Sequence, residues 1–151
     1  MTTPAPTAPL LDSRVIGLAH YAARAVLETV LARHGIGFEQ HVTLRLAAAA
    51  DGPVERDRLV DGVAGTLKIG AAEVNTAIDQ LIDGKLLADQ APSRVRITDA
   101  GRELYDRTVT EIRPLSARIY AGIPTEDLAV AGRVLTLVTE RADAELAALT
   151  E

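Results

Sequence analysis

The stretch "VNTAIDQLIDGKLLADQAPSRVRITDAGREL", residues 74–104, changes its hydrophobic period twice. In its first part Val74, Ile78 and Leu81 recur at helical spacing, which predicts a helix over about 70–83 with one apolar face. The segments "LLADQ" and "RVRIT" are then short and strand-like, and "APS" between them predicts a tight hairpin. Thr98 follows as the expected cap of another helix, over about 99–121.

The second strand of this hairpin has two different faces. Val95 and Ile97 alternate with Arg94 and Arg96. Successive side chains of a strand point to opposite faces, so the two arginines are expected together on the outward face.

Upstream, apolar residues at helical spacing predict three helices, over about 11–34, 38–50 and 55–64. Asp12 or Ser13 is the expected cap of the first. "RHGIG", "DGP" and "GTLKIG" are expected to be the breaks and turns between these helices and the next. The residues expected to lie inside are apolar: Val42, Leu44, Leu46, Ala47, Leu59, Val60 and Val63.

Downstream, Pro114 falls inside the predicted helix over 99–121 and is expected to kink it or reset its start. "GIPTED" ends that helix, and Thr125 is the expected cap of a last helix over about 126–149. Apolar residues alternate at spacings of three and four along the last helix, which suits packing against another helix. They are Leu128, Ala131, Leu135, Val138, Ala142, Leu146 and Leu149.

Length and composition favour an ordinary soluble protein. A chain of 151 residues is expected to form one domain with a real core. It has no cysteine, which excludes disulfides and thiolate metal sites, and its start lacks the pattern of a secretory signal. The apolar runs are shorter than a membrane span, so we expect a cytoplasmic protein without membrane contact. The net charge of −5 argues against indiscriminate nucleic-acid binding but permits a local basic patch.

Three helices followed by a two-stranded hairpin predict a winged helix-turn-helix. The expected fold is mainly α with a small β-hairpin wing, flanked by long N- and C-terminal helices. We expect a flexible arm over 1–9 and a single domain over 10–151, in which 38–98 form the winged helix-turn-helix lobe.

The sequence resembles the MarR family of bacterial transcription regulators. The resemblance rests on "VRITDAGREL", residues 95–104, which matches the family's strand–Thr–x–x–Gly–helix signature, and on the apolar pattern of residues 55–87. It implies a homodimer in which 10–37 and 99–151 supply the dimerisation helices. It also implies a pseudo-palindromic double-stranded DNA operator with half-sites roughly 34 Å apart. Many relatives loosen their grip on DNA when a small, often phenolic, ligand binds near the dimer interface.

The expected DNA-binding side chains divide into base readers and phosphate holders. Amide and hydroxyl side chains on the predicted helix over 70–83 can bond to base edges, although the acid Glu73 lies among them. Phosphate contacts are expected from arginines of the wing and the following helix, with Arg56 and Arg58 as further candidates. The predicted set is Lys68, Asn75, Thr76, Gln80, Arg94, Arg96 and Arg102.

Two His-x-x-x-Arg pairs offer a second candidate site. His20 and Arg24 are neighbours on one helix, and His41 and Arg45 on the next. If these helices face each other, the four side chains could line a crevice for an anionic or aromatic effector. The alternative is that they are solvated or dimer-interface side chains.

No feature of the sequence points to catalysis, a metal or a cofactor. There is no cysteine nucleophile, Gly-rich phosphate loop or G-x-S-x-G. The three histidines lack a tight metal-ligand spacing. We therefore expect a regulator that binds DNA, acts as a repressor and is released by a small ligand. The alternative is a dimeric winged-helix protein-interaction module with weak or no DNA binding.

Overall fold

The computed structural model describes residues 7–151, which form two compact units. The first unit ends at Arg113, and the second is Pro114–Glu151. Most of the predicted arm over residues 1–9 lies outside the described residues, and residues 7–12 have no regular secondary structure. The division into a dimerisation part and a lobe over 38–98 stays a prediction.

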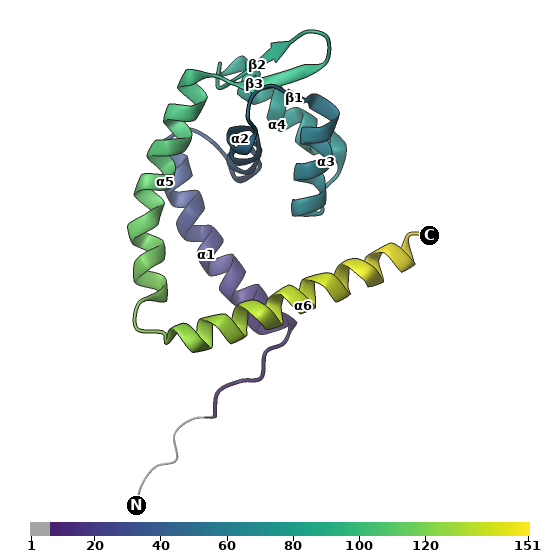
Figure 1. The fold of residues 1–151 in the computed structure, drawn as a ribbon. Coiled ribbons are helices and arrows are strands. Elements are labelled where there is room, and N and C mark those ends of the chain that lie inside the picture. The colour runs from purple at the N-terminus through teal and green to yellow at the C-terminus, as the bar shows by residue number, and fades with distance from the viewer. Residues whose placement is uncertain (1–6) are drawn as a thin grey trace, which may run out of the picture. The chain divides into compact units, whose positions relative to one another are not determined.

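The order of the elements confirms the predicted fold class, a mainly helical winged helix-turn-helix (Figure 1). In chain order they are α1 (Ser13–Arg33), α2 (Phe38–Ala49), β1 (Val54–Glu55), α3 (Arg56–Leu67), α4 (Ala71–Asp83), β2 (Leu87–Gln90), β3 (Arg94–Ile97), α5 (Asp99–Tyr120) and α6 (Thr125–Leu149).

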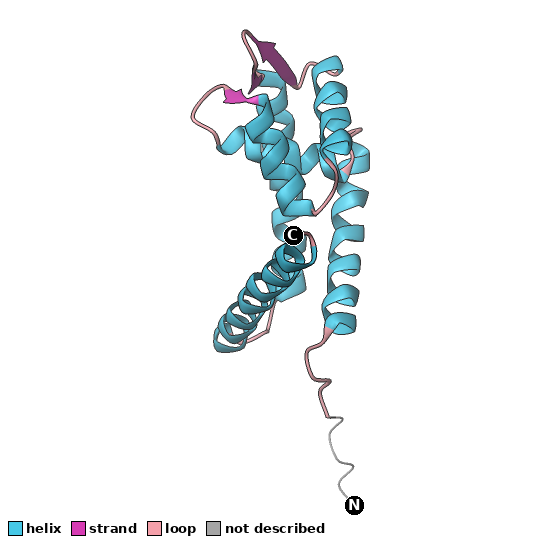
Figure 2. Cartoon of the chain, turned by 90° about the vertical axis from the view of Figure 1, so that its right-hand side faces the viewer, coloured by secondary structure: helices cyan, strands magenta, loops and turns pink. Residues whose placement is uncertain are grey.

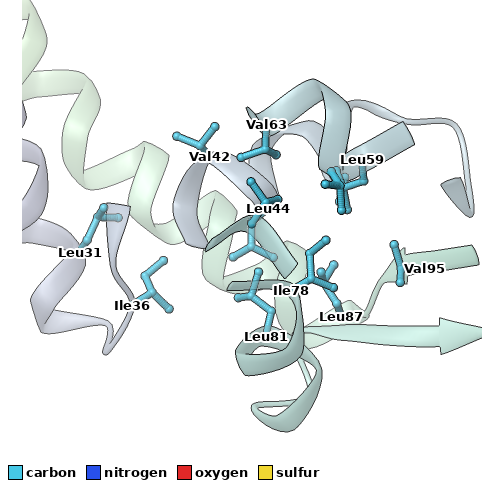
Figure 3. Close-up of a cluster of buried hydrophobic side chains, with 13 residues drawn as sticks. Leu31, Ile36, Val42, Leu44, Leu59, Val63, Ile78, Leu81, Leu87 and Val95 are labelled. Atoms are coloured by element: carbon cyan, nitrogen blue, oxygen red, sulfur yellow. The ribbon is translucent and has the colours of Figure 1, made fainter. Parts of the chain in front are cut away.

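The core of the first unit lies where α2, α3 and α4 meet (Figure 3). The predicted apolar stripe of α4 is buried, with Val74 and Ile78 fully enclosed. Leu44 of α2 and Val63 of α3 belong to the same buried cluster. Burying a side chain of this size stabilises the fold by about 1.5–3 kcal/mol. The stripe therefore holds one face of α4 against the core and leaves the opposite face outside.

The wing is a three-stranded antiparallel sheet in the order β1-β3-β2, whose strands are drawn in magenta in Figure 2. The predicted hairpin is present, with Leu87 opposite Ile97. The prediction of two strands was incomplete, because Val54 of β1 also pairs with Val95. A two-residue strand is too short to show a period of its own, so only the pairing reveals it.

The wing returns to α5 through the Thr-x-x-Gly motif. Thr98 Oγ1 accepts a hydrogen bond from the Gly101 N–H at 3.0 Å, which confirms the predicted cap. The same hydroxyl donates to the Lys85 carbonyl at 2.7 Å, and the Thr98 N–H donates to the Leu86 carbonyl at 3.1 Å. A Cβ on Gly101 would stand 2.1 Å from that Leu86 oxygen, so only glycine fits. The motif thus fastens the start of α5 to the segment between α4 and β2.

Three helix ends or interiors differ from expectation. α3 continues through the predicted turn to Leu67, and Lys68 ends it in the left-handed conformation (φ 57°) with its N–H bonded to the Ala64 carbonyl. The helix tolerates Gly65, which sequence reasoning took as a break. α5 runs through Pro114 without a new start. α6 begins after Pro124 with no side-chain cap, so Thr125 is not the cap.

The predicted cap of α1 is confirmed. Asp12 Oδ1 accepts a hydrogen bond from the Val15 N–H at 2.9 Å.

Two helices expose much of their apolar surface. α6 has no buried residue, and its exposed large hydrophobic side chains include Leu135 and Val138. α1 buries only Val30 and Leu31 along its length. Among the described helices, α1 alone is long and apolar enough to meet the length and hydropathy criterion for a membrane span. Core helices and signal sequences meet the same criterion, so it does not by itself place the chain in a membrane.

Candidate nucleic-acid interface

The outer face of α4 is polar and carries acid without base. Glu73, Thr76, Asp79, Gln80 and Asp83 are exposed on it. The buried stripe occupies the opposite side of the helix. Any DNA contact made by this face must therefore rely on neutral hydrogen-bonding groups or on acceptors.

Asn75, one of the predicted base readers, is engaged within the protein. Arg56, the first residue of α3, donates from Nε to Asn75 Oδ1 at 3.0 Å. The Nδ2 group of Asn75 donates to the Ala71 carbonyl at 3.1 Å. Arg56 Nη2 also pairs with Asp79 Oδ1 at 2.6 Å. These bonds fix the orientation of the Asn75 amide and leave it one N–H and one oxygen lone pair for a base, while Arg56 ties the start of α3 to α4.

The other two predicted readers keep free hydrogen-bonding capacity. The Thr76 hydroxyl donates to the Ala72 carbonyl at 3.0 Å and retains its acceptor lone pairs. Gln80 Oε1 accepts from Gln40 Nε2 at 2.8 Å. Within residues 7–151, no group accepts a hydrogen bond from the Gln80 amide nitrogen. Thr76 and Gln80 share the lining of a groove of about 300 Å³ between α2 and α4.

Lys68 lies in the turn of the helix-turn-helix, immediately before α4. Its side chain is exposed, and its Nζ donates to the Gly65 carbonyl at 2.8 Å. That bond keeps the ammonium near the end of α3 in the free protein.

The wing places the predicted arginines opposite its buried face. Val95 is fully buried, whereas Arg96 is exposed and Arg94 is half-buried. Arg94 lies across from Glu55 in the β1–β3 register. It also lines an open pocket of about 450 Å³ together with Asp57 and Asp89. Acidic side chains therefore share this pocket with the arginine and weaken the positive potential predicted for the wing tip.

The charge balance of the whole lobe follows the same trend. Arg102 is exposed in the first turn of α5 and adds one base beside the wing. From Phe38 to Thr98, however, acids outnumber bases by two: Arg45, Arg56, Arg58, Lys68, Lys85, Arg94 and Arg96 against Glu39, Asp51, Glu55, Asp57, Asp61, Glu73, Asp79, Asp83 and Asp89. The predicted basic patch is thus local, and we expect few phosphate contacts.

The two His-x-x-x-Arg pairs occupy different surroundings. His20 and Arg24 line a pocket of about 230 Å³ with Phe38, whose ring lies 4.0 Å below the Arg24 guanidinium carbon. Arg24 also pairs with Glu28 at 3.0 Å. His41 and Arg45 do not line that pocket. The structure therefore does not bring all four predicted ligand-binding residues into one described pocket.

His41 is buried between α2 and α5. Its ring lies 5.7 Å from the Tyr105 ring, measured between centroids, and its Nδ1 has no hydrogen-bond partner. Burial lowers the pKa of His41 below its ordinary 6.5, and the nearby Arg45 charge lowers it further. The neutral imidazole is therefore the form that the fold favours.

Residues 7–151 contain no group of three or more histidine or acidic side chains arranged to hold a metal ion. His34, the remaining histidine, instead bonds through Nε2 to Glu111 Oε1 at 3.0 Å. This contact joins the end of α1 to α5.

Sequence reasoning missed the roles of Gln40 and of the Arg56–Asp79 pair. Gln40 and Gln80 are 40 residues apart, and Arg56 and Asp79 are 23 apart. No local pattern connects residues at such separations, so only the packing of α2 and α3 on α4 brings them together.

Solved structures share this architecture over most of the chain. MarR from Staphylococcus aureus, in complex with salicylate and kanamycin, superimposes with a TM-score of 0.74 over 87% of this chain and 90% of its own, at 18% identity. The chain has the fold of the MarR family regulators.

Two further structures carry ligands. A MarR family protein of Mycobacterium tuberculosis in complex with DNA matches at 21% identity over 87% of this chain and 98% of its own, with a TM-score of 0.66. CouR from Rhodococcus jostii bound to p-coumaroyl-CoA matches at 21% identity over 82% and 86%, with a TM-score of 0.67. No protein-family model and no curated protein matches the sequence.

Proposed function

We propose that the protein is a homodimeric, sequence-specific DNA-binding transcriptional regulator that acts as a repressor in the cytoplasm. The observation that carries this proposal is the α4 face. Only one face of α4 packs against the core, and the opposite face is exposed. The helix ends at Asp83, and the chain continues directly into the wing. A winged helix-turn-helix uses such a helix in the major groove. The structural neighbour in complex with DNA supports the same use.

The exposed apolar surfaces support a dimer. A helix of 25 residues without one buried side chain is unusual for a folded chain, because its apolar seam remains in water. A second copy that covers α6 and the open face of α1 would remove this surface. We propose residues 10–37 and 99–151 as the dimerisation part, and residues 38–98 as the DNA-binding lobe.

A small anionic or aromatic effector completes the proposal. Structural neighbours contain salicylate, p-coumaroyl-CoA and p-aminosalicylic acid, all of which combine an aromatic ring with an anionic group. In this chain the His20–Arg24 pocket offers a guanidinium beside an aromatic ring. A thermal-shift panel of aromatic acids tests this part, because a ligand of the folded state raises the melting temperature.

The DNA-binding proposal is tested by fluorescence anisotropy with the upstream DNA of the protein's own gene. A shuffled fragment of equal length and composition is the control, at two salt concentrations. Specific regulators bind their sites roughly a thousandfold or more tighter than other DNA. Equal affinity for the two fragments would reject the proposal.

One observation favours the alternative of a protein-interaction module. The exposed face of α4 carries Glu73, Asp79 and Asp83 and no base, which would suit a basic partner protein. A dimer that binds neither fragment at low salt would support this second function.

A further inference from the structure

Gln80 is the last member of a chain of hydrogen bonds that starts at α2. The Gly37 N–H, at the beginning of α2, donates to Gln40 Oε1 at 2.9 Å. Gln40 Nε2 then donates to Gln80 Oε1 at 2.8 Å. Gln40 is half-buried and Gln80 is exposed on α4. The amide of Gln80 is thus held by a residue outside its own helix.

The direction of both amides follows from the first donor. A backbone N–H can only donate, so the side of Gln40 that faces Gly37 must be its oxygen. Its NH₂ group therefore faces Gln80, and that contact requires the oxygen of Gln80. The Gln80 oxygen is turned toward α2. Both N–H groups of the Gln80 amide nitrogen remain without a partner in the described part of the chain.

The neighbouring amide on α4 is fixed in a different way. Arg56 Nε, which also can only donate, faces Asn75 Oδ1, and the Ala71 carbonyl, which can only accept, faces Asn75 Nδ2. Each polar end of Asn75 is therefore fixed by a partner inside the protein, and one N–H of its Nδ2 is left over. Gln80 is the α4 amide whose two N–H groups both remain without a partner in the described part of the chain.

We propose that Gln80 is a specificity-determining residue that presents N–H donors to base edges, and that Gln40 is the positioning residue that sets this orientation. The inference rests on the proposed DNA-binding function. In the major groove, guanine and thymine present a keto oxygen, whereas adenine and cytosine present an amino group. An amide that offers N–H groups can bond O6 and N7 of guanine or O4 of thymine, but only N7 of adenine and no acceptor of cytosine, so it favours the keto bases on the strand it contacts. An amide free to turn would accept either kind.

The substitution Gln40→Glu tests the orientation most sharply. A carboxylate only accepts, so it can still bind the Gly37 N–H but must now receive a donor from Gln80. That bond turns the Gln80 amide and exposes its oxygen, which favours adenine or cytosine. The added charge weakens binding to every sequence alike, so the readout is the affinity ratio between duplexes that differ at one base pair.

The duplexes come from selection of a randomised pool with the wild-type protein. At the position read by Gln80, the wild type should prefer a keto over an amino base by about 5- to 100-fold. Gln80→Ala should bring the ratio near one, and Gln40→Glu should reverse it. Glu39→Gln, a neighbour outside the hydrogen-bond chain, is the control and should leave the ratio unchanged. An unchanged ratio in Gln80→Ala, or the same preference in Gln40→Glu, would overturn the proposal.

A measurement on the free dimer separates this inference from the proposed function. Nuclear magnetic resonance of side-chain amides should show the Gln80 NH₂ signal moving downfield in Gln40→Glu, as it gains a hydrogen bond, and staying in place in Glu39→Gln. A signal that does not move rejects the role of Gln40, even for a protein that binds DNA specifically. A moving signal in a protein that selects no sequence supports the orientation and rejects the DNA-binding function instead.

Discussion

Gly101→Ala is expected to loosen the attachment of the wing to α5. The new Cβ would stand 2.1 Å from the Leu86 oxygen and 2.9 Å from Ile97 Cγ1, where ordinary contacts begin near 3.4 Å. Leu86 would have to move by roughly 1 Å. That carbonyl also accepts the Thr98 N–H at 3.1 Å, so the movement breaks or lengthens a hydrogen bond at the base of the wing.

The expected cost has two parts. Overpacking a well-filled site costs about 1–3 kcal/mol. Weakening one hydrogen bond adds about 0.5–1.5 kcal/mol. The sum is about 1.5–4.5 kcal/mol, which for a chain of this size lowers the melting temperature by roughly 3–18 °C.

Urea unfolding of the variant and the wild type, followed by circular dichroism, measures this loss. Gly65→Ala is the matched control, since a Cβ there meets nothing within 4 Å and alanine favours the helix. The control should be neutral or more stable by up to about 1 kcal/mol. A Gly101→Ala protein as stable as the wild type would refute the account of the Thr-x-x-Gly motif.

Three further predictions concern charge and assembly. Because the folded state lowers the pKa of His41, the unfolded state binds the extra proton, so the free energy of unfolding should fall as the pH drops below 6.5. This dependence should be smaller in His41→Gln, as urea titrations at several pH values would reveal. Arg94→Ala should weaken DNA binding about equally for all sequences and reduce the salt slope by about one, measured by anisotropy, with the dimer intact. Val138→Glu should convert the dimer to monomers in light scattering, because it buries a charge at the proposed interface; a variant that stays dimeric would exclude this seam.

The sequence predicted most of the fold because the deciding signals are local. The apolar stripe of α4, the alternation around Val95 and the Thr98 cap each involve residues a few positions apart. Helix and strand periods and caps act over such distances. β1 and the last turn of α3 escaped prediction, because the first depends on a distant partner strand and the second passes through a glycine.

The candidate interface was predicted less fully, for the same reason. Composition identified Thr76, Gln80 and the wing arginines as polar groups near the expected DNA. It did not indicate that Asn75 accepts a hydrogen bond from Arg56, or that Asp57 and Asp89 line the same pocket as Arg94. Those relations arise from packing between helices and strands that are distant in sequence. They add acidic neighbours to the local basic patch predicted for the wing, and they fix the orientation of one predicted base reader, Asn75.

Hydroxyl-radical footprinting of the upstream fragment tests the central claim most directly, because it shows how the protein lies on DNA. A homodimer that places one α4 in each of two major grooves should protect two segments related by two-fold symmetry, about 10 base pairs from centre to centre. Protection of both segments by the wild type, and its loss in the monomeric Val138→Glu protein, is the expected result. Uniform protection along the fragment, or none at low salt, would contradict the claim that this protein is a dimeric reader of a DNA sequence.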